Sequence, residues 1–196
     1  MTKYIKKVSL KSVENYLGVN LTCDTISIGA DTACYYTSFA VIKTTNSYLI
    51  LESLEKITVP KLAKKVTIKQ VLNNVDLFTE QLDYLKNKWS KKYKFDQTRI
   101  EDCFYQFSIK TTKLLAYNGI LTYDRLKRIS KNTTLTMPNS ARKNINFKAS
   151  QKKLPRIKLK KEIIKYINLA LNLKIENDNE SDAIVLALSG LIKNEI

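Results

Sequence analysis

The feature that most constrains the fold is an apolar run that ends on an acidic residue, Ile26 to Asp31. Small and β-branched residues fill this run, and a second run of the same kind, residues 35–43, follows after a short turn. The pattern predicts two consecutive buried β-strands. A carboxylate at the end of a buried strand is costly unless something pairs with it, so Asp31 is a candidate for a metal-binding or catalytic role.

The remaining patterns predict an α/β domain. Further strands are expected at about 47–57, 97–107 and 133–137, and helices at about 68–89, 109–129, 160–172 and from 179 onward. Together these elements predict a mixed five-stranded sheet flanked by helices. Residues 1–25 carry only a weak helical signal. We therefore expect an N-terminal extension at 1–25, packed on the domain or on a partner, and one main domain at 26–196.

The charge of the chain favours a polyanionic partner. The formal net charge is +16, and residues 142–174 carry eleven Lys and Arg residues against one acid, Glu162. Nucleic acid is the partner class that such a balance favours. Acidic residues follow this basic block directly, at Glu176, Asp178, Glu180 and Asp182. The arrangement suggests phosphate binding beside cation binding, and the alternative is a solvated charged face next to a helix cap.

Several function classes are excluded or disfavoured by composition. The chain has no histidine, which excludes Ser-His and Cys-His nucleophilic catalysis and argues against an ordinary zinc site. Hydrolytic chemistry would then rest on carboxylates, lysines or a metal held by oxygen ligands. Three unevenly spaced cysteines favour reduced thiols in the cytoplasm. No run reaches the length of a membrane span, and the N-terminus lacks a signal peptide's apolar core.

Three acidic residues are placed so that they can converge. Asp31 ends the first strand, Glu101 lies in the fourth strand, and Asp182 opens the last helix. A right-handed crossover would set the fourth strand parallel to and beside the first, and a helix packed on that face would bring Asp182 near. Clustered carboxylates repel each other, and two Mg²⁺ or Mn²⁺ ions would relieve that repulsion. The alternative is that Glu101 is a strand-edge residue and Asp182 forms a capping box with Asn179.

Three short motifs resemble those of RuvC-like Holliday junction resolvases in the RNase H-like superfamily. Residues 27–31 followed by 37–42 are similar to the first motif of that family, a strand that ends in Gly-hydrophobic-Asp. Residues 100–104 are similar to its second motif, in which a glutamate precedes an aromatic residue by three positions. Asp182 followed by an alanine is similar to its last motif. The resemblance covers about residues 26–194, and it implies an RNase H-like fold and a nuclease that uses two Mg²⁺ or Mn²⁺ ions.

The sequence departs from the family pattern at two places. Thr32-Ala33 replaces the Pro-Gly pair that is common after the first aspartate. Asn179 stands where the family usually has Asp or His, three residues before the last Asp. Asp178 lies four residues before Asp182, on the same face of a helix, and is an alternative ligand. Glu180 would join the site only if the first helical turn were irregular.

The resemblance also implies DNA contacts and an assembly. Phe104 would pack against bases at the crossover, although its alternative role is ordinary core packing. Lys143 would lie close to the scissile phosphate. Lys160, Lys161 and Lys165 would contact DNA elsewhere. The family's resolvases are homodimers, and the helix at about 109–129, which is apolar on more than one face, is the expected dimer contact.

The sequence as a whole predicts a magnesium-dependent endonuclease that resolves four-way DNA junctions by paired symmetric nicks. Three alternatives remain open: a broader enzyme that cuts other branched DNA, a nuclease for RNA–DNA hybrids, and a catalytically silent junction-binding module in which Asn179 marks a decayed site. The Lys-, Asn- and Ile-rich composition suggests an AT-rich genome, such as that of a phage or a low-GC bacterium.

Overall fold

A six-stranded sheet forms the centre of the computed structural model, which describes residues 6–62, 67–102, 109–148 and 154–193, with the backbone alone at 109–113. The strands are β1 (Lys6–Ser9), β2 (Ile26–Thr32), β3 (Tyr36–Thr44), β4 (Tyr48–Thr58), β5 (Phe95–Glu101) and β6 (Ser130–Thr136). The helices are α1 (Leu10–Leu17), α2 (Ile68–Ser90), α3 (Ile109–Lys127), α4 (Pro138–Asn144), α5 (Arg156–Leu171) and α6 (Asp178–Ser189).

The sheet is mixed, with the order β1-β4-β3-β2-β5-β6. Strands β2, β3 and β4 form an antiparallel meander, and β5 and β6 then add in parallel beside β2. The two parallel additions are reached through α2 and α3. The predicted neighbourhood of the first and fourth core strands is therefore confirmed, and the mixed α/β class with it.

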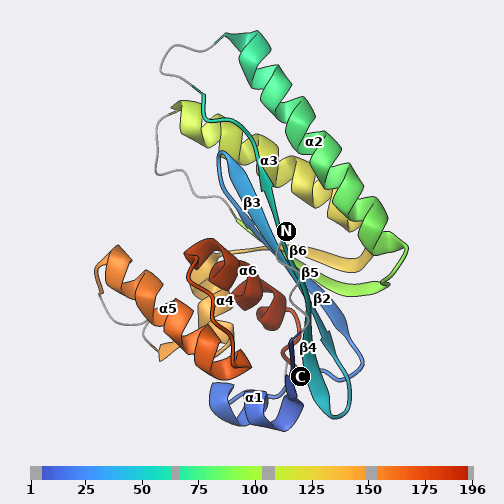
Figure 1. Cartoon of the computed structure of the whole chain (residues 1–196), viewed down its shortest axis with the longest axis vertical. Helices are drawn as coiled ribbons and strands as arrows, with labels where there is room; N and C mark the ends of the chain where they lie inside the picture. Colours follow the sequence, from blue (N-terminus) through green and yellow to red (C-terminus); the bar gives the residue numbers. More distant parts are fainter. Residues whose placement is uncertain (1–5, 63–66, 103–108, 149–153, 194–196) are drawn as a thin grey trace.

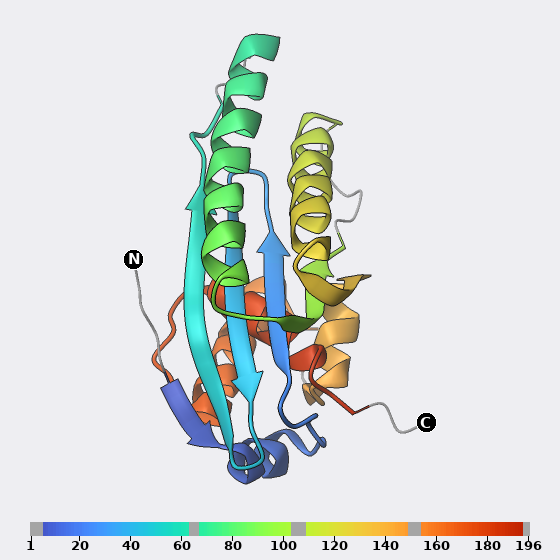
Figure 2. The same ribbon diagram turned by 90° about the vertical axis from the view of Figure 1, so that its right-hand side faces the viewer.

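Helices cover both faces of the sheet (Figures 1 and 2). Helices α2 and α3 lie on one face, where Phe39, Phe78 and Trp89 are among the buried side chains. Helices α1, α4, α5 and α6 lie on the other face, over a second and larger apolar core. No helix in the described part of the chain combines the length and apolarity that a membrane crossing requires.

The prediction of five strands is wrong by one, because β1 adds a sixth. Strand β1 pairs antiparallel with β4, with Val8 opposite Leu49. The four residues Lys6–Ser9 are too short and too lysine-rich to give a clear strand pattern. Helix α1 follows at once and ends at Gly18, whose φ of 66° is left-handed. Residues 6–21, predicted as an extension, thus contribute both to the sheet and to the core.

Three boundaries near the acidic residues also differ from prediction. Strand β5 ends at Glu101, and the Asp102 N–H then bonds to the Thr136 carbonyl, while residues 103–107 of the predicted strand lie outside the described residues. Helix α4 was not predicted, and it begins with a proline at its first turn, where a missing N–H costs nothing. Helix α6 begins at Asp178, capped by Asn177. As a result, Glu101 lies at the end of β5, Arg142 in the last turn of α4, and Asp178 at the start of α6.

Candidate active site

The parallel pairing of β2 and β5 brings two acidic residues together. Ala30 is in register with Ile100, so the next residues, Asp31 and Glu101, lie side by side at the carboxyl ends of the two strands. Asp31 is buried, and a hydrogen bond joins its carboxyl group to that of Glu101. Glu101 also accepts a hydrogen bond from the Thr32 backbone. Two carboxylates this close repel each other when both are charged.

A glycine in β2 lets helix α6 approach this edge. A Cβ atom added at Gly29 would lie 2.0 Å from the Ala183 carbonyl oxygen and 2.4 Å from the Ala187 nitrogen. No side chain fits there, so the backbone of α6 packs directly on the strand. Asp182, one residue before Ala183, is consequently held at the acidic end of β2. Gly29 of the first motif is therefore needed so that α6, which carries Asp182 of the last motif, can pack against β2.

All the predicted metal ligands line one pocket, of about 650 Å³. Its walls include Asp31, Glu101, Asp182, Asp178 and Asn179. Glu180 lies elsewhere and lines a different pocket. Because α6 starts at residue 178, both Asp178 and Asn179 sit in its first turn, and both line the pocket. The structure therefore brings together the five residues that the sequence singled out.

Burial raises the pKa of each of the three central carboxyl groups. The pKa of Asp31 is well above its ordinary value, first because of burial and then because of the hydrogen bond and negative charge of Glu101. Burial likewise raises the pKa of Glu101 and that of Asp182, the latter against the lowering effect of Arg142. Such a cluster is stabilised by positive charge. Oxygen donors alone fit Mg²⁺ or Mn²⁺.

In the state described, basic side chains supply part of that charge. Arg142 Nη2 donates to both oxygens of Asp182, at 2.8 and 3.0 Å, and Lys160 forms an ion pair with Asp178. Within the described residues, no group of three or more Asp, Glu, Cys or His side chains has the arrangement of a metal site. The carboxylates are thus of the type that binds Mg²⁺ and line one pocket, but they are not arranged as a metal site in the state described, and two of them are paired with Arg142 and Lys160.

Arg142 is a pocket residue that the sequence analysis did not single out. It was counted only as the first residue of the basic block, whereas its neighbour Lys143, which was singled out, is exposed and does not line the pocket. Of the three lysines predicted as further DNA contacts, Lys160 lines the pocket, while Lys161 and Lys165 are exposed on α5. If a helix starting at Pro138 had been predicted, Arg142 would have been expected about one helical turn after that proline. Phe104 lies outside the described residues.

Two more polar residues shape the pocket and were also missed. The Tyr36 hydroxyl donates to Asn179 Oδ1 at 3.1 Å. The buried Asn118 of α3 donates to the carbonyls of Ala33 and Cys34, at 2.8 and 3.2 Å. These bonds fix the turn after Asp31, where Thr32-Ala33 replaces the Pro-Gly of the family pattern. No local sequence signal points to them, because each joins residues far apart in the chain.

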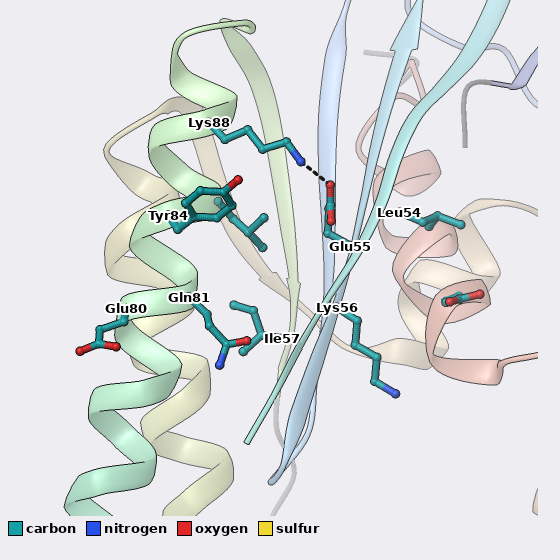
Figure 3. A pocket seen from close by; sticks show the side chains of 10 residues that line it. Leu54, Glu55, Lys56, Ile57, Glu80, Gln81, Tyr84 and Lys88 are labelled. Atoms are coloured by element: carbon teal, nitrogen blue, oxygen red, sulfur yellow. Dashed lines mark hydrogen bonds and ion pairs between the residues drawn. The ribbon is translucent and has the colours of Figure 1, made fainter. Parts of the chain in front are cut away.

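A second pocket is lined by residues of β4 and α2 together with Glu180 of α6 (Figure 3). Leu54, Ile57 and Tyr84 give it apolar walls. Its Glu55 forms an ion pair with Lys88 at 2.7 Å, and Glu80 lies apart from that pair on α2. The carboxylates of this pocket are therefore dispersed or singly paired, in contrast to those at the end of β2.

No sequence-defined protein family and no curated protein sequence matches the chain. Solved structures do. RuvC of T. thermophilus in complex with a Holliday junction substrate is 11% identical, with 84% of this chain and 91% of that chain covered, at a TM-score of 0.60. A second Thermus thermophilus RuvC structure is 12% identical, with 84% and 92% covered, at 0.58. The yeast mitochondrial Holliday junction resolvase Ydc2 is 13% identical, with 90% and 82% covered, at 0.48.

The two RuvC structures show that this chain has the RuvC-like fold of the RNase H-like class. The resemblance that the three motifs indicated is therefore confirmed in the fold.

Proposed function

We propose that this protein is a metal-dependent endonuclease that resolves four-way DNA junctions by paired symmetric nicks. The observation that carries the proposal is the convergence of Asp31, Glu101 and Asp182 at one pocket whose rim is basic. The RuvC-like fold supports it, since one solved RuvC structure with this fold holds a Holliday junction substrate. The net charge of +16 supports DNA as the partner.

The site residues divide into metal ligands and phosphate contacts. Asp31, Glu101 and Asp182 would hold two Mg²⁺ or Mn²⁺ ions, with Asp178 or the Asn179 oxygen completing the set. Bound divalent ions activate a water molecule and stabilise the leaving oxygen in phosphodiester hydrolysis. Both Asp31 and Glu101 bind a cation as charged carboxylates, and burial beside each other raises the pKa of both groups. Tyr36 holds the Asn179 oxygen in place through its hydroxyl.

The DNA interface would extend from the pocket over α4 and α5. Lys160 and Arg156 line the pocket, and Lys143, Lys161 and Lys165 are exposed on the same side of the sheet. Ammonium and guanidinium groups in such positions bind phosphates and fix the register of the DNA. Phe104 is proposed to contact bases at the crossover. Its place beside Glu101 in the sequence is the support for that role.

A homodimer would present two such sites to the two-fold symmetric junction. The proposed contact is α3, on which Tyr117 and Ile120 are 51% and 65% exposed. Large apolar side chains left open on a helix are typical of a surface that another protein covers. We propose the cytoplasm as the place of action, because the cysteine pattern favours reduced thiols.

Cleavage of a labelled four-way junction tests the proposal. The wild-type protein is expected to nick opposing strands in Mg²⁺ and to be inactive in EDTA, and Asp31→Asn is expected to be inactive in both. Cutting that persists in Asp31→Asn, or no cutting by the wild type, would contradict the enzyme proposal. An RNA–DNA hybrid and a linear duplex are tested in parallel. A clear preference for the hybrid would replace junction resolution by hybrid cleavage.

A further inference from the structure

Two of the carboxylates near the start of α6 are held by basic side chains from other helices. Arg142, in the last turn of α4, engages Asp182, and Lys160, in α5, engages Asp178. The two ion pairs connect three helices around the mouth of the pocket. All four residues line it.

In the Arg142–Asp182 ion pair, both oxygens of the carboxylate are engaged by the guanidinium. One guanidinium nitrogen, Nη2, lies within hydrogen-bond distance of both Asp182 oxygens. The two side chains are only 11% and 18% exposed, so water does little to weaken their attraction. A divalent cation at Asp182 would use the same oxygens and would be repelled by the guanidinium charge. Arg142 and a metal ion are therefore competitors for Asp182.

Arg142 also has hydrogen-bonding capacity that this pair leaves unused. Its Nε is buried and has no hydrogen-bond partner among the described residues. An unfilled donor on a nearly buried guanidinium is costly, and a second acceptor would remove that cost. A phosphate group accepts from a guanidinium in the two-pronged way that matches its geometry. The side chain that carries this donor lines the same pocket as the acids.

We propose that Arg142 is a positioning residue that exchanges partners during loading of the site. It neutralises Asp182 when no metal is bound, and it turns to a DNA phosphate when a divalent cation takes Asp182. This inference rests on the proposed nuclease function and adds a coupling to it. Metal and DNA then favour each other's binding, because each releases the group that the other needs. Lys160 of α5 and Asp178 of α6 form a second ion pair of the same kind.

Titration with Mn²⁺ alone, followed by electron paramagnetic resonance of the free ion, measures the competition without DNA or cutting. Arg142→Gln is expected to bind Mn²⁺ about 5- to 10-fold more tightly than the wild type. Lys91→Gln removes the same charge from an exposed position at the end of α2, away from the pocket, and is expected to leave the affinity unchanged. Equal affinity in Arg142→Gln and the wild type would overturn the inference.

Thermal unfolding distinguishes exchange from a purely structural role. Arg142→Gln leaves Asp182 without its counter-charge, so the variant is expected to be less stable than the wild type in EDTA and to recover with Mn²⁺. A simple clasp between α4 and α6 would instead lose the same stability with and without metal. If Arg142→Gln does not fold, Arg142→Lys keeps the charge but loses the guanidinium fork, and a gain of about twofold in Mn²⁺ affinity is then expected.

A double-mutant cycle on DNA affinity in EDTA tests the second half of the exchange. Arg142→Gln is expected to change junction affinity little in the wild-type background, where Asp182 holds the guanidinium. In the Asp182→Asn background the same change is expected to cost about 5- to 10-fold, because Arg142 is then free to bind phosphate. Additive effects would contradict the exchange. A wild type that binds no Mn²⁺ would instead refute the proposed nuclease function itself.

Discussion

Ion pairs between a basic residue and a carboxylate occur on both faces of the sheet, and their surroundings differ. On the α2 face, Lys88 pairs with Glu55 and Lys92 with Glu52, and the lysines are 43% and 59% exposed. Such open pairs contribute about 0–1 kcal/mol. On the α6 face, the paired Asp182 lies beside the buried Asp31 and Glu101, so one cation does not satisfy the cluster. We therefore infer a functional site only on the α6 face, where the carboxylates outnumber the basic side chains that pair with them.

The largest difference between the two faces is expected from removal of one paired carboxylate on each. Asp182→Asn is expected to lower the rate of junction cleavage in Mg²⁺ by about 10³-fold, because it removes a proposed metal ligand. Glu55→Gln, which breaks the Lys88 pair on the opposite face (Figure 3), is expected to change that rate less than about twofold. Single-turnover cleavage rates measure both.

The mode of helix packing also differs between the faces. Helix α6 packs its backbone on Gly29, whereas α2 packs large side chains such as Trp89 on the sheet. Gly29→Ala is expected to destabilise the protein by about 3 kcal/mol or more and to weaken Mn²⁺ binding, because α6 has to move. Trp89→Phe is expected to reduce stability on the opposite face and leave Mn²⁺ affinity unchanged. Urea unfolding and metal titration separate the two effects.

Preserved Mn²⁺ affinity in Gly29→Ala would show that the close approach of α6 does not set the site. Gly190→Ala provides a graded comparison. Its added Cβ meets a side-chain atom, Ser27 Oγ at 2.7 Å, which moves more easily than the backbone does. Its effect on stability is expected to be smaller than that of Gly29→Ala.

Asp31→Asn is expected to stabilise the metal-free protein. The folded pKa of Asp31 is raised, so the native state binds more protons than the unfolded state between the ordinary value of 3.8 and the folded one. This group's contribution to stability therefore falls as pH rises through that window. At neutral pH the substitution is expected to gain about 0.5–2 kcal/mol in EDTA, and the gain should vanish as pH falls to 3.8. Thermal unfolding across pH measures it, and destabilisation at pH 7 would be the contrary result.

The smallest expected effect concerns exposed lysines on the two faces. Neutralising Lys161 and Lys165 on α5 is expected to reduce the slope of log affinity against log salt for junction binding by about 0.9 for each residue. Neutralising Lys91 and Lys94, which are exposed at the far end of α2, is expected to leave that slope unchanged. Equal slopes for both double variants would remove α5 from the proposed interface.

The sequence determined much of the fold and the acidic part of the site. Alternating and continuous apolar runs predict strands through local side-chain preferences, and five of the six strands and the Thr67 capping box follow from them. Asp31 was identifiable because a charge at the end of a buried strand conflicts with burial. Glu101 could be placed beside Asp31 because a right-handed crossover sets its strand parallel to and beside the first. Asp182 could be placed near them because a helix packed on that face would bring it there. These inferences depend on neighbours in the chain or on general rules of connection.

Only the tertiary structure decided what holds those acids. The pairing of Arg142 with Asp182 depends on the rotation of a seven-residue helix that no sequence pattern marked. The Tyr36–Asn179 hydrogen bond joins residues 143 positions apart, and β1 becomes a strand only because the edge of β4 accepts it. Local preferences cannot specify such contacts, because their free energy appears only once distant elements are packed together. The sequence therefore indicates which carboxylates form the candidate site, whereas tertiary packing decides which basic side chains pair with them.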